Sequence, residues 1–301
     1  MIPEVLQYGF MQRALLASLL VGLAAPAVGV FLVQRRLSLI GDGIGHVALT
    51  GVAVGLLTAR SPVLTALVAA VAGALAIELI RARGRTSGDI ALAVLFYGGI
   101  AGGVVVVGLA EGGSTATLNA YLFGAITTTT RQDLVAFAVL AVTVLAVALV
   151  LAGRLFAVSA DEEYARASGL PVLALNVVLA VLTAVTVVVS MRVVGLLLIS
   201  ALMILPVAAA QLLRGSFRGT ALLAVLIGVV VSVSGVSVSF YANTPSGGTI
   251  VLLAIGVFVI AAGVAGLGAR WSRWRGREPA SPHPAPLLWG GEVPDPDEGR
   301  T

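Results

Sequence analysis

The chain has 301 residues, of which 59% are hydrophobic and only 11% are charged, and its mean hydropathy is +1.07. A soluble protein carries about 25% charged residues, so this composition excludes a soluble enzyme and predicts an all-α polytopic membrane protein. Every one of the 18 basic residues is Arg and there is no cysteine, so the chain lacks a P-loop lysine and any thiolate ligand. If the protein uses ATP, another chain must hydrolyse it, and we expect this chain not to be an enzyme.

Nine apolar segments are long enough to cross a bilayer core of about 30 Å. A polar, Thr-rich stretch at 111–131 would suit a short interfacial or re-entrant helix, and its ambiguity makes eight spans possible as well. We expect a transmembrane domain at residues 1–270 and a disordered cytoplasmic tail, rich in Pro and acidic residues, at 271–301. The predicted spans cover residues 10–33, 42–58, 63–80, 90–109, 134–151, 173–191, 193–213, 221–240 and 248–267.

Arginine marks one side of the predicted bundle. Most of the 18 Arg fall in loops at alternate ends of the spans, and the opposite side holds few. By the positive-inside rule, this pattern places the N-terminus outside and the C-terminus in the cytoplasm. The Arg-only, Ala- and Val-rich usage indicates a bacterial gene, so the expected location is a bacterial cell membrane. The net charge of +4 therefore reflects topology and not nucleic-acid binding.

One stretch at the head of the second span carries the chemistry, Gly41-Asp42-Gly43-Ile44-Gly45-His46. Residues four apart on an α-helix share a face, so Asp42 and His46 should point the same way. Carboxylate and imidazole suit Zn²⁺ or Mn²⁺. A charged residue inside a membrane costs about 2.5–3.5 kcal/mol, which makes Asp42 a functional candidate. The alternative is structural: Asp42 caps the helix and His46 is a packed, hydrogen-bonded side chain.

Three further features of the spans have structural explanations. Gly51 and Gly55 have the spacing that lets helices pack closely in lipid. Pro206 interrupts the seventh segment, where neighbouring helices can satisfy the carbonyl group that it frees. Glu78 lies three residues before Arg81, which predicts an ion pair at the end of the third span rather than a transport role.

A short polar helix is predicted between the fifth and sixth spans, at residues 159–169. Ser159 is the expected N-cap and Gly169 the expected stop, with acidic residues in the first turn and a basic residue in the last. Solvated linkers are usually simple connectors, but a helix with both ends specified is more often a docking element. Its charged residues are Asp161, Glu162, Glu163 and Arg166.

Three stretches, taken together, resemble the membrane-permease subunit of the zinc/manganese/iron ABC importers over about residues 5–268. Residues 42–55 are similar to the family pattern S-D-x-[IL]-S-H-x-x-x-P-G-[VI]-A. Residues 161–169 resemble D-E-x-x-A-x-x-x-G. Residues 194–208 resemble V-G-x-L-L-[VL]-x-A-L-[LM]-I-x-P-A-A. None of the three is decisive alone, but their order and spacing are specific.

The resemblance implies a type II ABC-importer-like permease that works with a second permease copy, two cytoplasmic ATPases and an extracytoplasmic metal-binding protein. It implies that Asp42 and His46 line the metal pathway, that the chain binds no cofactor of its own, and that ATP is bound by the partner subunit. A twofold axis beside the second span would bring together two carboxylates and two imidazoles. The resemblance assigns the contact with the ATPase to Asp161, Glu162, Glu163, Ala165, Arg166 and Gly169.

The sequence departs from the family pattern beside the ligands. Gly41 and Gly45 stand where Ser is usual, and Thr50 stands where Pro is usual. The loss of two hydroxyl groups puts the hydrogen bonding that orients the ligands in doubt.

Two alternative functions remain open from the sequence. A permease of the cobalamin/siderophore type has a similar architecture but no need for the Asp–His pair. A stand-alone secondary cation transporter often shows internal repeats and several charges within the membrane, which this chain lacks apart from Asp42. The ligands do not discriminate among zinc, manganese and iron, and the sequence does not separate a homodimer from a heterodimer.

Overall fold

The computed structural model describes residues 7–83, 88–109, 120–124, 129–196 and 198–274. Within these ranges the regular structure is helical, and eight helices are long and apolar enough to cross a membrane. The chain divides into two compact units, Met1–Ala262 and Gly263–Thr301. The helices are α1 (Gly9–Gln34), α2 (Ile40–Leu57), α3 (Pro62–Ala82), α4 (Gly88–Leu109), α6 (Arg131–Val150), α7 (Ala152–Ala160), α8 (Glu162–Ala167), α9 (Val172–Ser190), α10 (Ile199–Leu213), α11 (Phe217–Ala242) and α12 (Ser246–Trp274).

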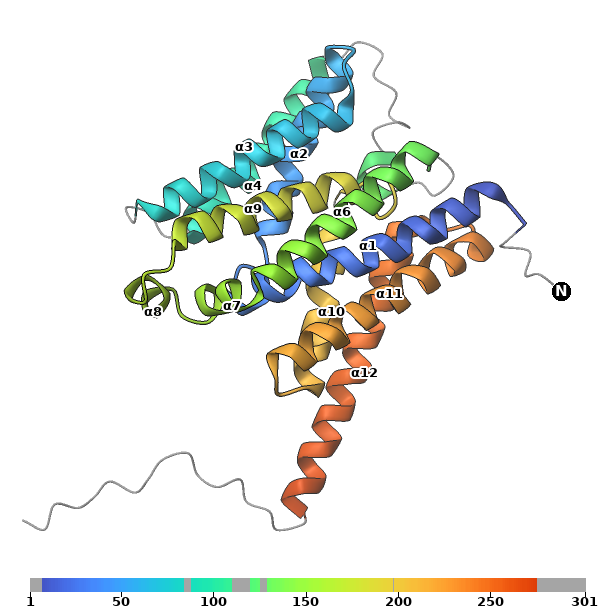
Figure 1. The fold of residues 1–301 in the computed structure, drawn as a ribbon. Coiled ribbons are helices and arrows are strands. Elements are labelled where there is room, and N and C mark those ends of the chain that lie inside the picture. The colour runs from blue at the N-terminus through green and yellow to red at the C-terminus, as the bar shows by residue number, and fades with distance from the viewer. Residues whose placement is uncertain (1–6, 84–87, 110–119, 125–128, 197, 275–301) are drawn as a thin grey trace, which may run out of the picture. The chain divides into compact units, whose positions relative to one another are not determined.

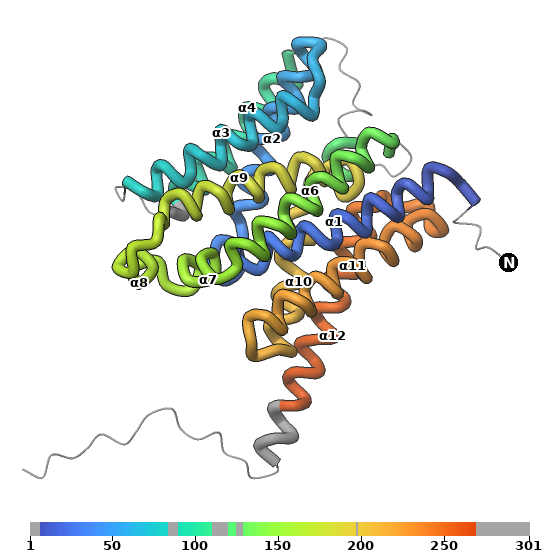
Figure 2. The backbone as a smooth tube through the Cα atoms, in the orientation of Figure 1, coloured from blue at the N-terminus to red at the C-terminus, as the bar shows by residue number. Residues whose placement is uncertain are grey.

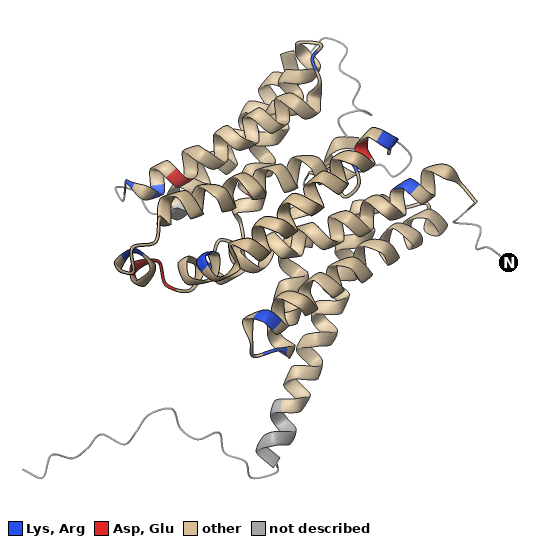
Figure 3. Cartoon of the chain, viewed as in Figure 1, with Lys and Arg blue, Asp and Glu red and all other residues tan. Residues whose placement is uncertain are grey.

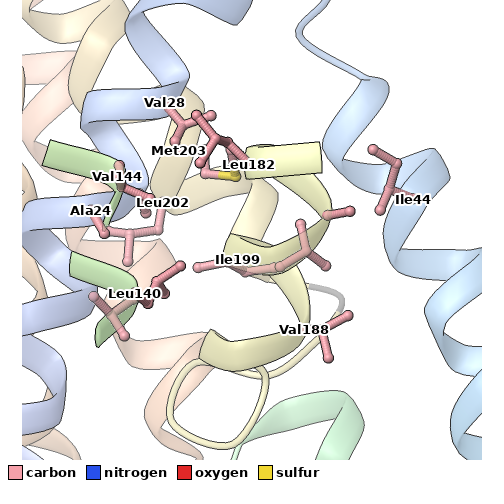
Figure 4. Packing of buried hydrophobic residues seen from close by; sticks show 14 of the residues in the cluster. Ala24, Val28, Ile44, Leu140, Val144, Leu182, Val188, Ile199, Leu202 and Met203 are labelled. Atoms are coloured by element: carbon pink, nitrogen blue, oxygen red, sulfur yellow. The ribbon is translucent and has the colours of Figure 1, made fainter. Parts of the chain in front are cut away.

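Helix α1 lies at the centre of the first unit. It packs along α11 and also contacts α6 and α10, while α2 lies between α3 and α4, and α3 contacts α9 (Figures 1 and 2). Glycines allow these close approaches: a Cβ atom at Gly22 would lie 2.9 Å from the carbonyl oxygen of Gly228, and one at Gly29 would collide with that of Met203. The buried side chains in Figure 4 fill the space between these helices.

The seventh predicted span is wrong in its first part. The segment expected at residues 193–213 is not one helix, because α10 begins only at Ile199 and is too short to be a span by itself. Gly195 has a φ of +92°, which a non-glycine residue rarely adopts, and it breaks the helix there. The amide of Leu196 instead donates to the carbonyl oxygen of Tyr121 at 2.9 Å. Among the described residues, eight helices are therefore span-length, one fewer than the nine segments predicted.

The segment between α6 and α9 contains two helices where one was predicted. Ser159 is buried inside α7 and is not the N-cap of the polar helix. The cap is Asp161, whose Oδ1 accepts a hydrogen bond from the amide of Tyr164 at 2.9 Å. Because Asp161 is extended, the chain turns between α7 and α8. Gly169 follows α8 with a φ of +78°, at the predicted stop.

Charged residues lie mainly near the ends of the described helices, and the spans between them are uncharged over most of their length (Figure 3). The predicted ion pair between Arg81 and Glu78 is confirmed, with 3.0 Å between Nη1 and Oε1. At the other end of the bundle, Arg192 Nη1 donates to Asp133 of α6 at 2.7–2.8 Å. Helix α12 continues to Trp274, past the predicted start of the tail at residue 271. The rest of the predicted tail lies outside the described residues.

Candidate metal site and coupling segment

Asp42 lies inside α2 and does not cap it. The helix begins at Ile40, two residues before the predicted start, and its N-cap residue Leu39 makes no side-chain capping bond. Oδ1 of Asp42 instead accepts a hydrogen bond from the hydroxyl of Ser200, at the start of α10. The structural reading of Asp42 as a helix cap is therefore wrong.

The Asp42–Ser200 contact lies well inside the bundle. Ser200 is the second residue of α10, so at 1.5 Å per residue it lies about 20 Å along the helix axis from Leu213. Arg214, which follows α10, marks the charged end. The partly exposed Asp42 side chain is therefore far from the charged end of α10, and a charge placed there needs a reason.

His46 follows Asp42 by four residues on α2 and packs against α4. Its ring lies edge-on to Phe96, with 4.3 Å between the ring centroids and 73° between the planes. Among the described residues, no polar group pairs with its buried Nδ1 atom. Of the alternative that His46 is a packed, hydrogen-bonded side chain, the structure confirms the packing against Phe96, but it leaves Nδ1 unpaired among the described residues. An unpaired polar atom of this kind is unusual in a folded protein.

One copy of the chain does not complete a metal site. The described part of the chain contains no group of three or more His, Cys, Asp or Glu side chains close enough to share an ion. Asp42 and His46, both partly exposed, would thus supply only two ligands where Zn²⁺ takes four and Mn²⁺ more.

Helix α8, the predicted contact with the ATPase, is tied to the end of α1 by one ion pair. Glu162 of α8 accepts from Arg166 at 3.0 Å and from Arg35, at the C-terminal end of α1, at 3.3 Å. The Arg35 side chain is only 4% exposed. Burial lowers the pKa of Arg35 from its ordinary value, and the charges of Glu78 and Glu162 oppose that shift. Arg35 is therefore a buried cation that is paired with Glu162 of α8 and feels the charge of Glu78 on α3.

A groove of about 860 Å³ opens beside these charges. It is bounded by the end of α3, by α8 and by the start of α9. Oδ1 of Asn176, in the wall of this groove, is buried and unpaired among the described residues. The polar lining residues are Glu78, Arg81, Glu162, Arg166 and Asn176.

The structure places the predicted packing residues at helix contacts. A Cβ atom at Gly51 would lie 2.6 Å from Cα of Ala66 on α3, and one at Gly55 would lie 2.7 Å from Cα of Pro62. Pro206 is buried in the middle of α10. Sequence reasoning missed Ser200 and the partnership of Arg35, because each contacts a residue more than 100 positions away.

Span-length apolar helices surround α1, and an acid and an imidazole lie one turn apart on α2, as in a polytopic membrane permease. The chain belongs to the ABC 3 transport family, whose family model matches residues 7–265.

Relatives and a solved structure agree with this family. The manganese transport system membrane protein MntC of Listeria innocua is 31% identical over 256 residues, which is 85% of this chain and 91% of that protein. The manganese import system permease protein ScaB of Streptococcus parasanguinis is 32% identical, over 84% of this chain and 90% of that one. The structure of PsaBC from Streptococcus pneumoniae in complex with a Fab matches with a TM-score of 0.77 and 31% identity, over 87% of this chain and 95% of that chain.

Proposed function

We propose that the chain is the permease subunit of an ABC importer that moves a divalent metal ion into the cell. Manganese is the first candidate, because the similar MntC and ScaB proteins carry manganese in their names; zinc and iron are the others. The observation that carries the proposal is the Asp42–His46 pair, held inside the bundle on one helix. A carboxylate and an imidazole match Mn²⁺, Zn²⁺ and Fe²⁺ alike.

A second copy of the chain would complete the site. Two copies related by a twofold axis beside α2 would supply two Asp42 carboxylates and two His46 imidazoles. The two carboxylates would offset the charge of the divalent ion. Four protein ligands leave the shell of Mn²⁺ incomplete, which suits a pathway that must release its ion. We expect a homodimer, an extracytoplasmic protein that delivers the metal, and a pair of ATPase subunits.

In this proposal α8 docks on the ATPase. The distribution of arginine predicts that α8 lies on the cytoplasmic side, where the ATPase would be. Movement of α8 would pass through Glu162 to Arg35, at the end of α1, only seven residues before Asp42. The N-terminus then lies outside. Because the chain has no cysteine, labelling of Ser168→Cys from the cytoplasmic side and of Ser61→Cys from outside tests this orientation; the reverse pattern would contradict it.

We expect Arg35→Gln to uncouple ATP hydrolysis from transport. The variant removes the buried cation that joins α8 to α1, and loss of one partner from such a pair is costly. In proteoliposomes with the ATPase, metal uptake should fall about tenfold while ATP hydrolysis persists. Arg35→Lys should recover part of the uptake. The control is Arg36→Gln. Because Arg36 is exposed, this variant should transport normally. Equal uptake by Arg35→Gln and Arg36→Gln would contradict the proposed route.

Purification of the chain from its native membrane tests the class of function. A stable complex with an ATPase, and uptake that needs ATP, would support the importer. Metal transport by the chain alone in liposomes would instead favour a secondary transporter.

A further inference from the structure

The start of α10 contacts Asp42, one of the two residues of the candidate metal site. The Ser200 hydroxyl donates to Oδ1 of Asp42, and the Ser200 side chain is buried. A carboxylate whose Oδ1 accepts a hydrogen bond no longer rotates freely. The remaining lone pairs, chiefly those of Oδ2, are left to face a cation.

Gly41 makes room for this contact. A Cβ atom at Gly41 would lie 3.2 Å from Cβ of Ser200, and 3.6 Å from its Cα. A larger residue at position 41 would therefore press on α10 at the place where Ser200 reaches Asp42. Position 41 is one of the two at which Gly stands where the family pattern has Ser.

The backbone before Ser200 is fixed by contacts with two other segments. Leu196 donates to the carbonyl oxygen of Tyr121 at 2.9 Å, and the Ser246 hydroxyl donates to that of Val193 at 2.9 Å. A Cβ atom at Gly195 would lie 2.5 Å from the carbonyl oxygen of Leu122. Residues 193–196 are thus closely packed, three residues before the start of α10 that presents the Ser200 hydroxyl.

We propose that Ser200 is a positioning residue for metal binding: its hydroxyl orients the Asp42 carboxylate toward the cation. This inference rests on the proposed function of Asp42 as a metal ligand. The hydroxyl holds the carboxylate in one orientation even without metal, so less side-chain conformational entropy is lost when the ion binds. Groups that hydrogen-bond to a metal ligand typically contribute about 10–100-fold to the affinity for the metal.

The test is metal uptake by the permease–ATPase complex in proteoliposomes, with ⁵⁴Mn²⁺ as the probe. Ser200→Ala should raise the KM for Mn²⁺ about tenfold, with a much smaller change in the maximal rate. Ser200→Thr keeps the hydroxyl and should stay close to the wild-type KM. Ser237→Ala is the matched control, because the Ser237 hydroxyl donates only within its own helix, to Val233 at 2.8 Å.

The outcomes separate this inference from the function on which it rests. If Asp42→Asn abolishes uptake but Ser200→Ala has the KM of Ser237→Ala, Ser200 has no positioning role. If Asp42→Asn transports normally, the metal site itself is misplaced. Should Ser200→Thr lose uptake, equilibrium binding of Mn²⁺ by the Ser200→Ala complex decides: a Kd raised about tenfold supports the inference, and an unchanged Kd overturns it.

Discussion

Replacing Asp42 with Asn is expected to abolish metal uptake while the complex with the ATPase still assembles. The substitution keeps the shape of the side chain and its contact with Ser200, but it removes the negative charge that offsets the charge of the cation. We expect uptake to fall by more than about 100-fold, because a ligand contributes more than the groups around it. The measurement is ⁵⁴Mn²⁺ uptake in proteoliposomes, expressed per folded complex.

Asp133→Asn is the matched control for the loss of a carboxylate. Asp133 is also partly buried on a helix, but it is paired with Arg192 at 2.7 Å. Its loss should lower stability and leave uptake per folded complex unchanged. If Asp42→Asn retains wild-type uptake, or if Asp133→Asn loses as much, Asp42 is not the specific ligand that we propose.

Gly99→Ala is expected to have the second large effect, through packing. A Cβ atom at Gly99 of α4 would lie 2.6 Å from both the carbonyl carbon of His46 and the amide nitrogen of Val47. These are backbone atoms of α2 and cannot rotate away, so the two helices must separate beside His46. Overpacking of this kind costs about 1–3 kcal/mol, and we expect a lower thermal unfolding temperature and uptake reduced by at least about tenfold.

The neighbouring glycine gives an internal control. A Cβ atom at Gly98 would have nothing within 4 Å, and Ala is favoured over Gly in a helix by up to about 1 kcal/mol. Gly98→Ala should therefore unfold at the wild-type temperature or slightly above, with normal uptake. The same loss in both variants would show that helix propensity, and not the contact with α2, is responsible.

The sequence predicts most of the fold because a bilayer restricts the possible structures. Apolar stretches bounded by arginine have few alternatives to a membrane-spanning helix. The break before α10 was missed because residues 193–198 are apolar almost throughout, and only Gly195 disturbs an otherwise continuous pattern. The ends of the polar helix were placed within about two residues, with Asp161 rather than Ser159 as the cap.

The site was predicted only where its residues are neighbours in sequence. Asp42 and His46 are one helical turn apart, so their shared face follows from helix geometry. Ser200 reaches Asp42 across 158 positions, and Arg35 reaches Glu162 across 127. Such contacts depend on how α1, α2, α8 and α10 pack, and local periodicity carries no information about that packing. The metal-ligand and coupling roles of these residues remain predictions.

The central claim is that the two α2 side chains hold the transported ion, and the chain offers a direct test because it contains only two histidines. These are His46 and His283, the second of which lies outside the described residues. Pulsed EPR of Mn²⁺ bound to the purified permease–ATPase complex should detect coupling to an imidazole nitrogen. We predict that this coupling disappears in His46→Ala and persists in His283→Ala. Nitrogen coupling that persists in His46→Ala, or bound Mn²⁺ without nitrogen coupling in the wild type, would contradict the account.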